Sequence, residues 1–99
     1  MNSNIFIINH QKIYEMELRL IEYLKEEWEL NYYPIIHNIM ECLKIDDILT
    51  RSWFRSALIH LENRNFISIR NDLNGIYRIY EGLERMPNKY EFSDYWGGI

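Results

Sequence analysis

The chain contains little cysteine, proline or glycine, and each shortage excludes a class of protein. Its single cysteine, Cys42, cannot form an internal disulfide or a cysteine-rich metal cluster, which fits a reducing, cytoplasmic setting. Two prolines and four glycines, beside 47% hydrophobic residues, indicate a folded chain and exclude a disordered one. The 99 residues are enough for one domain with a modest core. We expect Cys42 to be a small buried hydrophobe in that core.

Long apolar runs are also missing. No run in the sequence approaches the roughly 20 apolar residues that span a bilayer, so we expect no membrane segment. The longest apolar patch near the amino terminus, residues 5–8, is too short for a signal peptide and has no basic flank. The chain is instead rich in isoleucine (16), asparagine (10) and tyrosine (8). This usage points to an AT-rich coding source, such as a low-GC bacterium or its phage.

The sequence has no recognisable catalytic or metal-binding pattern. Its histidines, His10, His37 and His60, lie in three separate segments, with no carboxylate or cysteine at metal-ligand spacing. The paired acids at 26–27 and 46–47 belong to no acid/base arrangement, and the only Gly-Gly pair is at the end of the chain. We therefore expect no enzyme, no metal site and no cofactor.

Apolar periodicity predicts two helices in the first half of the chain. The first follows a short strand or extended arm at residues 5–8, has Asn9 as its cap and ends near Asn31. Its apolar stripe consists of Ile13, Met16, Leu20, Leu24 and Trp28. The second helix begins with Pro34 at its first position, where a missing amide proton is tolerated, and the turn after it is marked by residues 46–47.

A third helix, at about residues 51–64, carries the most informative pattern. Thr50 or Ser52 is expected to cap it. Its inward positions are Phe54, Ala57, Leu58 and Leu61, and its outward positions are Ser52, Ser56, Ile59 and Asn63. The helix stops at Asn65, a residue that tolerates the left-handed conformation with which many helices end.

Two alternating runs, residues 66–70 and 76–80, follow the third helix. They are joined across Asn74-Gly75, a dipeptide typical of tight hairpins. The predicted fold is therefore α+β, with three helices, a C-terminal two-stranded β-hairpin and an optional short N-terminal strand. We divide the chain into an arm (1–11), a domain (12–80) and an aromatic extension (81–99), which either folds back on the core or docks on a second subunit.

The net charge of −4 conceals an uneven distribution. Residues 48–80 hold five arginines against two acidic residues, whereas residues 1–47 hold nine acidic residues against four basic ones. The local field decides whether phosphate is attracted, so the third helix and the hairpin are the candidate phosphate-binding surface. The plainer interpretation is that these arginines are ordinary solvated surface.

These segments resemble a known family. Residues 34–43 are similar to the second helix of the LexA-repressor-like winged helix domains, and residues 54–67 are similar to their recognition helix, with its Leu61-Glu62 pair and its closing Asn65. The resemblance covers residues 12–80 and does not include the protease domain of that family. The chain departs from the pattern at Lys44, where glycine is usual, and in a turn from 43 to 54 that looks a few residues longer.

The resemblance implies a winged helix-turn-helix fold and a small sequence-specific transcriptional regulator that binds double-stranded DNA. Its implied contacts are Arg51, Ser52, Arg55 and Ser56 on the reading helix, and Arg70, Asn71, Asn74 and Arg78 on the wing. One short monomer offers a small interface, so we expect a homodimer on a palindromic site. Residues 5–8 and the aromatic C-terminal segment are the expected dimer surfaces.

A second hypothesis is a winged-helix protein-binding module or phage-encoded inhibitor that does not bind DNA. Acidic total charge, an outward Ile59 and the aromatic C-terminal segment favour it, and fold alone does not decide between the two. Trp53 has two interpretations as well: it fills the gap between the second and third helices, or it lies exposed beside Arg51 and stacks on a partner. A domain without any partner is the third possibility.

Overall fold

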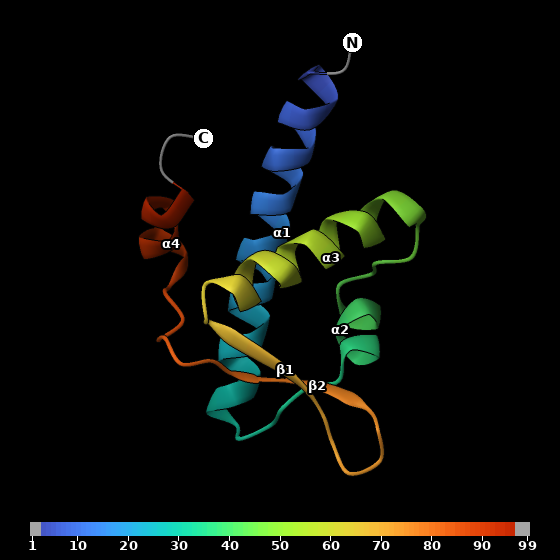
Figure 1. Ribbon diagram of the computed structural model, residues 1–99, viewed down its shortest axis with the longest axis vertical. Helices are drawn as coiled ribbons and strands as arrows, with labels where there is room; N and C mark the ends of the chain where they lie inside the picture. The colour runs from blue at the N-terminus through green and yellow to red at the C-terminus, as the bar shows by residue number, and fades with distance from the viewer. Residues whose placement is uncertain (1–2, 97–99) are drawn as a thin grey trace.

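The chain folds as an α+β unit in which helices are followed by an antiparallel hairpin (Figure 1). The computed structural model describes the backbone of residues 3–96 and the side chains of residues 10–92. The elements in chain order are α1 (Ser3–Glu29), α2 (Ile36–Cys42), α3 (Ile48–Asn63), β1 (Ile67–Asn71), β2 (Tyr77–Glu81) and α4 (Lys89–Trp96). The α+β class is confirmed, and the order from α1 to β2 is compatible with a winged helix.

Helix α1 begins much earlier than the sequence predicts. The short strand or extended arm at residues 5–8 is wrong, because α1 runs without a break from Ser3 to Glu29 and passes through Asn9, which is therefore not a cap. A strand at this place would need a partner for its backbone groups, whereas a continuous helix satisfies them internally. The upper half of α1 extends beyond α3 in Figure 1.

The hydrophobic core lies where α1, α3 and the hairpin meet. Leu20 and Leu24 of α1 are completely buried, as are Leu61 of α3 and Ile79 of β2. Burying a leucine or isoleucine of this kind contributes roughly 1.5–3 kcal/mol. The predicted inward face of α3 is confirmed, because Phe54, Ala57, Leu58 and Leu61 are all buried.

The start of α2 differs from the prediction by two residues. Pro34 is not its first residue: the helix begins at Ile36 after an extended Ile35. The carbonyl of Pro34 accepts a hydrogen bond from the amide of Ile79 at 3.0 Å, and Ile35 forms an isolated antiparallel bridge with Arg78. A strand-like contact therefore exists outside the hairpin, but it precedes α2 and not α1.

The turn between α2 and α3 takes the left-handed conformation that glycine usually supplies. Lys44 stands at this position with φ 57°, so a residue other than glycine adopts the left-handed conformation here. Helix α3 is capped by Asp47, and not by Thr50 or Ser52 as expected. The Asp47 carboxylate accepts from the Thr50 amide at 2.7 Å and from the Thr50 hydroxyl at 2.9 Å, so Thr50 is a partner of the cap.

The other end of α3 follows the prediction. Asn65 adopts φ 65°, which turns the chain from the helix directly into β1. Each strand begins one residue later than expected, and Ile69 pairs with Ile79 at the centre of the hairpin. The connection is longer than a two-residue turn, because the Asp72 amide donates to the carbonyl of Ile76 at 2.8 Å across it. Gly75 supplies a φ of 78° within this loop.

The aromatic extension forms a fourth helix that the sequence did not predict. The side chain of Asn88 caps α4 by accepting from the amides of Tyr90 and Glu91 at 2.9 and 2.8 Å. Phe92 is completely buried, and its ring stacks on Tyr14 of α1 with centroids 5.9 Å apart. The sequence left two alternatives for this segment, folding back on the core or docking on a second subunit. Phe92 folds back on the core.

Candidate nucleic-acid interface

Three of the four side chains predicted for the reading helix point into solvent. Arg51, Ser52 and Arg55 are exposed on α3, and Ser56 is half-buried. The opposite face of the helix is fixed in the core, and the Asp47 cap fixes its first turn. The amino-terminal part of α3 is therefore a rigid platform for these groups.

The charges of Arg51 and Arg55 are not used within the described part of the chain. Neither guanidinium makes a salt bridge or a hydrogen bond to another described residue, although Arg51 lies near Asp47. Hydrogen bonds from Thr50 hold the pKa of Asp47 below its usual value, and the charge of Arg51 adds to this effect. Both arginines are thus available to an outside anion.

The wing residues fall into two groups. Arg70, Asn71 and Asn74 are exposed on β1 and the loop, and the guanidinium of Arg70 lies 4.1 Å from the centre of the Tyr80 ring. This stacking positions the charge of Arg70 without neutralising it. In the view of Figure 1, the start of α3, helix α2 and the tip of the hairpin all lie along the right-hand side of the molecule.

Arg78, the fourth residue predicted for the wing, is engaged within the molecule. Its Nε donates to the Asp72 carboxylate at 3.0 Å, and its Nη1 donates to the Tyr33 carbonyl at 2.8 Å. The bond to Asp72 is the main reason that the pKa of Arg78 is raised above its usual value. The guanidinium therefore connects the wing to the segment before α2, and it is not a free charge on the surface.

The sequence did not predict a buried carboxylate, paired with basic side chains, between α1 and α3. Glu17 is completely buried, with one carboxylate oxygen 3.6 Å from His60 Nδ1 and 3.7 Å from Arg64 Nη1. Burial lowers the pKa of His60, and the charges of Arg64 and His10 add to this effect. The available signal was the position of Glu17 within the apolar stripe of α1.

Exposed apolar side chains share the outer surface of α3 with the arginines. Ile48 is 85% exposed, Leu49 is 56% exposed and Ile59 is 48% exposed, so the expected outward position of Ile59 is confirmed. Trp53 is half-buried, and the Lys12 ammonium of α1 lies 5.8 Å from the centre of its ring. Trp53 therefore matches neither interpretation fully. Its ring lies beside Lys12 of α1, and part of it is open to solvent.

Cys42 is exposed, which contradicts its expected burial in the core. Helix α2 is only seven residues long, and the one residue that it buries is Ile39. The Tyr23 hydroxyl lies 3.7 Å from the Cys42 sulfur and donates to it. Burial is the main reason that the pKa of Tyr23 is raised, so its hydroxyl remains protonated and continues to donate.

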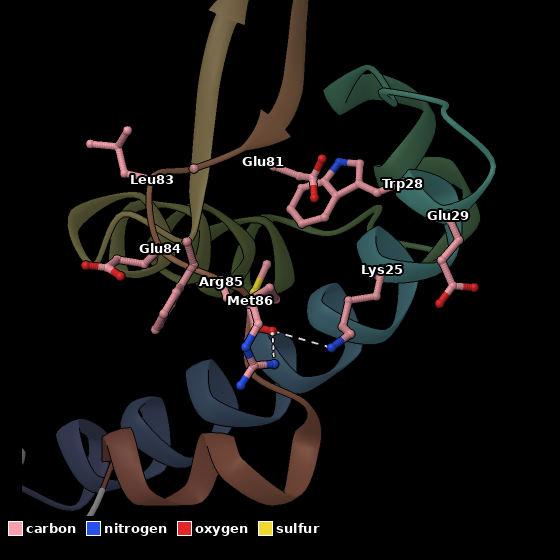
Figure 2. A pocket seen from close by; sticks show the side chains of 10 residues that line it. Lys25, Trp28, Glu29, Glu81, Leu83, Glu84, Arg85 and Met86 are labelled. Carbon is pink, nitrogen blue, oxygen red and sulfur yellow. Dashed lines mark hydrogen bonds between the residues drawn. The ribbon is translucent and has the colours of Figure 1, made fainter.

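A pocket of about 490 Å³ lies between α1 and the segment that follows β2 (Figure 2). Its basic side chains serve the fold: Lys25 and Arg85 both donate to the carbonyl of Met86, at 3.4 and 3.5 Å. The Arg85 guanidinium also forms a 3.0 Å salt bridge with Glu91 of α4. The side chains around this pocket therefore stabilise the segment between β2 and α4 against α1.

Comparison of the chain with protein-family models, with curated proteins and with solved structures gave no match. Within the described residues, no group of three or more histidine, cysteine or acidic side chains is arranged to hold a metal ion. None of the helices that the structure describes has the length and apolar character needed to cross a membrane.

Proposed function

We propose that the protein is a winged helix-turn-helix, DNA-binding transcriptional regulator. The observation that carries the proposal is the pair of exposed arginines, Arg51 and Arg55, in the first half of a helix whose other face is fixed in the core. A hairpin with another exposed cation, Arg70, follows this helix directly. Rigid helices with basic amino-terminal halves are suited to the major groove of DNA.

In this proposal α3 enters the major groove and the hairpin lies along the adjacent backbone. Arg51 and Arg55 read guanine edges or phosphates, and each good bidentate arginine–guanine pair supplies roughly 1–3 kcal/mol of discrimination. Ser52 adds a short hydroxyl donor beside them. Arg70 contacts phosphate, while Arg78 supports the wing from within.

The regulator would act as a homodimer, because one module of this size buries too little surface for tight specific binding. The surface best placed for a second copy is the groove between α1 and α4, whose lining includes Ile21, Asn88 and Tyr90. Tyr90 is 79% exposed although it lies next to the buried part of α4. The side chains of residues 5–8, and those of Tyr95 and Trp96, also belong to the expected dimer surfaces but lie outside the described side chains.

The test is selection of genomic fragments and random duplexes by the purified protein at low and high salt, followed by sequencing. We expect a palindromic site that is enriched at low salt and lost at high salt, because phosphate contacts release counterions. Arg55→Ala should weaken binding to that site by about tenfold or more. Arg85→Ala removes an exposed arginine elsewhere on the molecule and is the matched control. Failure to enrich any sequence at low salt would contradict the proposal.

A second candidate is a winged-helix module that binds another protein. The exposed Ile48, Leu49 and Ile59 on α3 favour it, since a second protein could cover these apolar side chains. Acidic total charge also disfavours non-specific attraction to nucleic acid. The two candidates differ in salt response, because binding driven by apolar burial does not weaken steeply as salt rises.

A further inference from the structure

The tip of the wing presents a leucine to solvent. Leu73 is 105% exposed, more than any other large apolar side chain that the structure describes. Ile76 and Tyr77, on the same loop and the strand after it, are 42% and 54% exposed. The tip of the hairpin therefore exposes apolar side chains, and Arg70 lies close to it, one residue before the end of β1.

The loop that carries Leu73 is held in one shape by Asp72. One oxygen of its carboxylate accepts from the amides of Asn74 at 2.8 Å and Ile76 at 3.0 Å, and the other accepts from Arg78. The backbone of Asp72 also accepts from the amide of Gly75 at 3.0 Å. These hydrogen bonds restrict the conformation of the loop, so Leu73 is held in its exposed position.

The loop has no cationic side chain with which to bind phosphate. Residues 72–76 include no lysine or arginine, and the charge of Asp72 is balanced by Arg78. The polar side chains beside Leu73 are instead Asn71 and Asn74, both exposed. Asparagine and arginine side chains read the minor groove, and leucine is one of the apolar residues that wedge between its base steps.

We propose that the wing inserts Leu73 into the minor groove as a wedge, with Asn71 and Asn74 against base edges and Arg70 at the groove entrance. This inference rests on the proposed function and adds a second mode of contact to it. The preferred flanking sequence would be A·T-rich with a pyrimidine–purine step, because such steps unstack easily and a narrow groove attracts arginine.

The variant Leu73→Ala tests the wedge, with Leu83→Ala as its control. Leu83 is 94% exposed on the segment after β2, so both variants lose an equally exposed leucine. The probe is a duplex selected from the random library by the wild-type protein, with 2-aminopurine placed at steps flanking the site of α3. We expect the wild type and Leu83→Ala to raise the fluorescence of one 2-aminopurine by unstacking it. Leu73→Ala should lose this signal and bind about tenfold more weakly.

Three results would overturn the inference, and they are distinguishable. If Leu73→Ala binds and unstacks like the wild type while Arg55→Ala loses affinity, the wedge is wrong and the regulator stands. If Leu73→Ala leaves DNA binding unchanged but alters the sedimentation of the free protein, the wing tip is a protein contact. If no duplex is retained at low salt, the inference and the proposed function fall together.

Discussion

At Gly82 two segments of backbone come so close that only glycine fits. A Cβ added there would lie 2.2 Å from the carbonyl oxygen of Asn65, whose own left-handed turn closes α3. The amide of Gly82 donates to the carbonyl of Phe66 at 3.1 Å, and the amide of Glu84 donates to Asn65 at 2.8 Å. The absence of a side chain at Gly82 therefore permits the path that the backbone takes from β2 toward α4.

Gly82→Ala should destabilise the protein by at least about 2 kcal/mol, because the clash is with backbone and cannot be relieved by a rotamer change. Gly75→Ala is the comparison: nothing lies within 4 Å of its added Cβ, and only its φ of 78° is unfavourable. Urea unfolding would measure both. A smaller loss for Gly82→Ala than for Gly75→Ala would contradict this account.

Asp47 should make the stability of the protein depend on acid. Its hydrogen bonds with Thr50 lower its pKa in the folded state, so its stabilising effect is present above the usual value of 3.8 and disappears as pH falls through the lowered pKa. Asp47→Ala should lower the melting temperature by a few degrees at pH 7 and by less near pH 2. Asp46→Ala removes an exposed neighbour outside the cap and should leave the melting temperature unchanged at both pH values. An equal loss of melting temperature at both pH values for Asp47→Ala would refute the role of its carboxylate.

At the scale of elements, the described side chains attach α4 to α1 mainly through the buried ring of Phe92, with an exposed Lys89–Glu22 salt bridge beside it. Phe92 contributes its whole side chain to the core, while Tyr90, two residues earlier, stays in solvent. The Arg85–Glu91 salt bridge beside the pocket of Figure 2 is exposed, so it adds little to this attachment. Apolar burial therefore accounts for the position of α4.

Phe92→Ala should cost about 3–5 kcal/mol, the range for deleting a buried phenylalanine. Tyr90→Ala should lie within about 0.5 kcal/mol of the wild type as a monomer. Thermal or urea unfolding monitored by circular dichroism would give both values. Equal effects of the two variants would show that α4 is not docked as described.

The elements that the sequence predicts well are those fixed by local signals. Helix α3 has a clear apolar period, Asn65 marks its end, and alternation marks both strands. The bridge between Ile35 and Arg78, the docking of Phe92 on Tyr14 and the hydrogen bond from Arg78 to the Tyr33 carbonyl join residues far apart in the chain, and no local pattern predicts them. The N-terminal extension of α1 was missed because its β-branched residues favour a strand locally, whereas a strand there has no partner.

For the candidate site, the sequence predicted which residue types are present, but not which side chains are left free to bind a partner. The exposure of Arg51 and Arg55 follows from their place opposite the core face of α3. That Arg78 is tied to Asp72, and that Leu73 stands free beside it, depends on the hydrogen bonds of the loop. Sequence alone gives all four wing residues the same weight.

At the scale of the whole molecule, the acidic excess and the exposed arginines lie on different segments of the chain, although Glu41 and Asp46 line the same hollow as Arg51. Most of the acidic excess lies on α1 and the segments around it, and the free arginines lie on α3 and β1. The potential beside α3 and β1, and not the total charge, decides whether a polyanion is attracted there. The proposed regulator therefore depends on a local field that outweighs a net charge of −4.

The most direct test of this claim is the salt dependence of binding to the selected duplex, measured by fluorescence anisotropy for the wild type, Arg55→Ala and Arg85→Ala. We predict that the logarithm of affinity falls linearly with the logarithm of salt for the wild type. Arg85→Ala should give the same slope as the wild type. If Arg55 contacts phosphate, Arg55→Ala should give a slope that is shallower by about one unit. If Arg55 reads a base, Arg55→Ala should bind more weakly with an unchanged slope. Affinity that is independent of salt, or equal for all three proteins, would contradict the account.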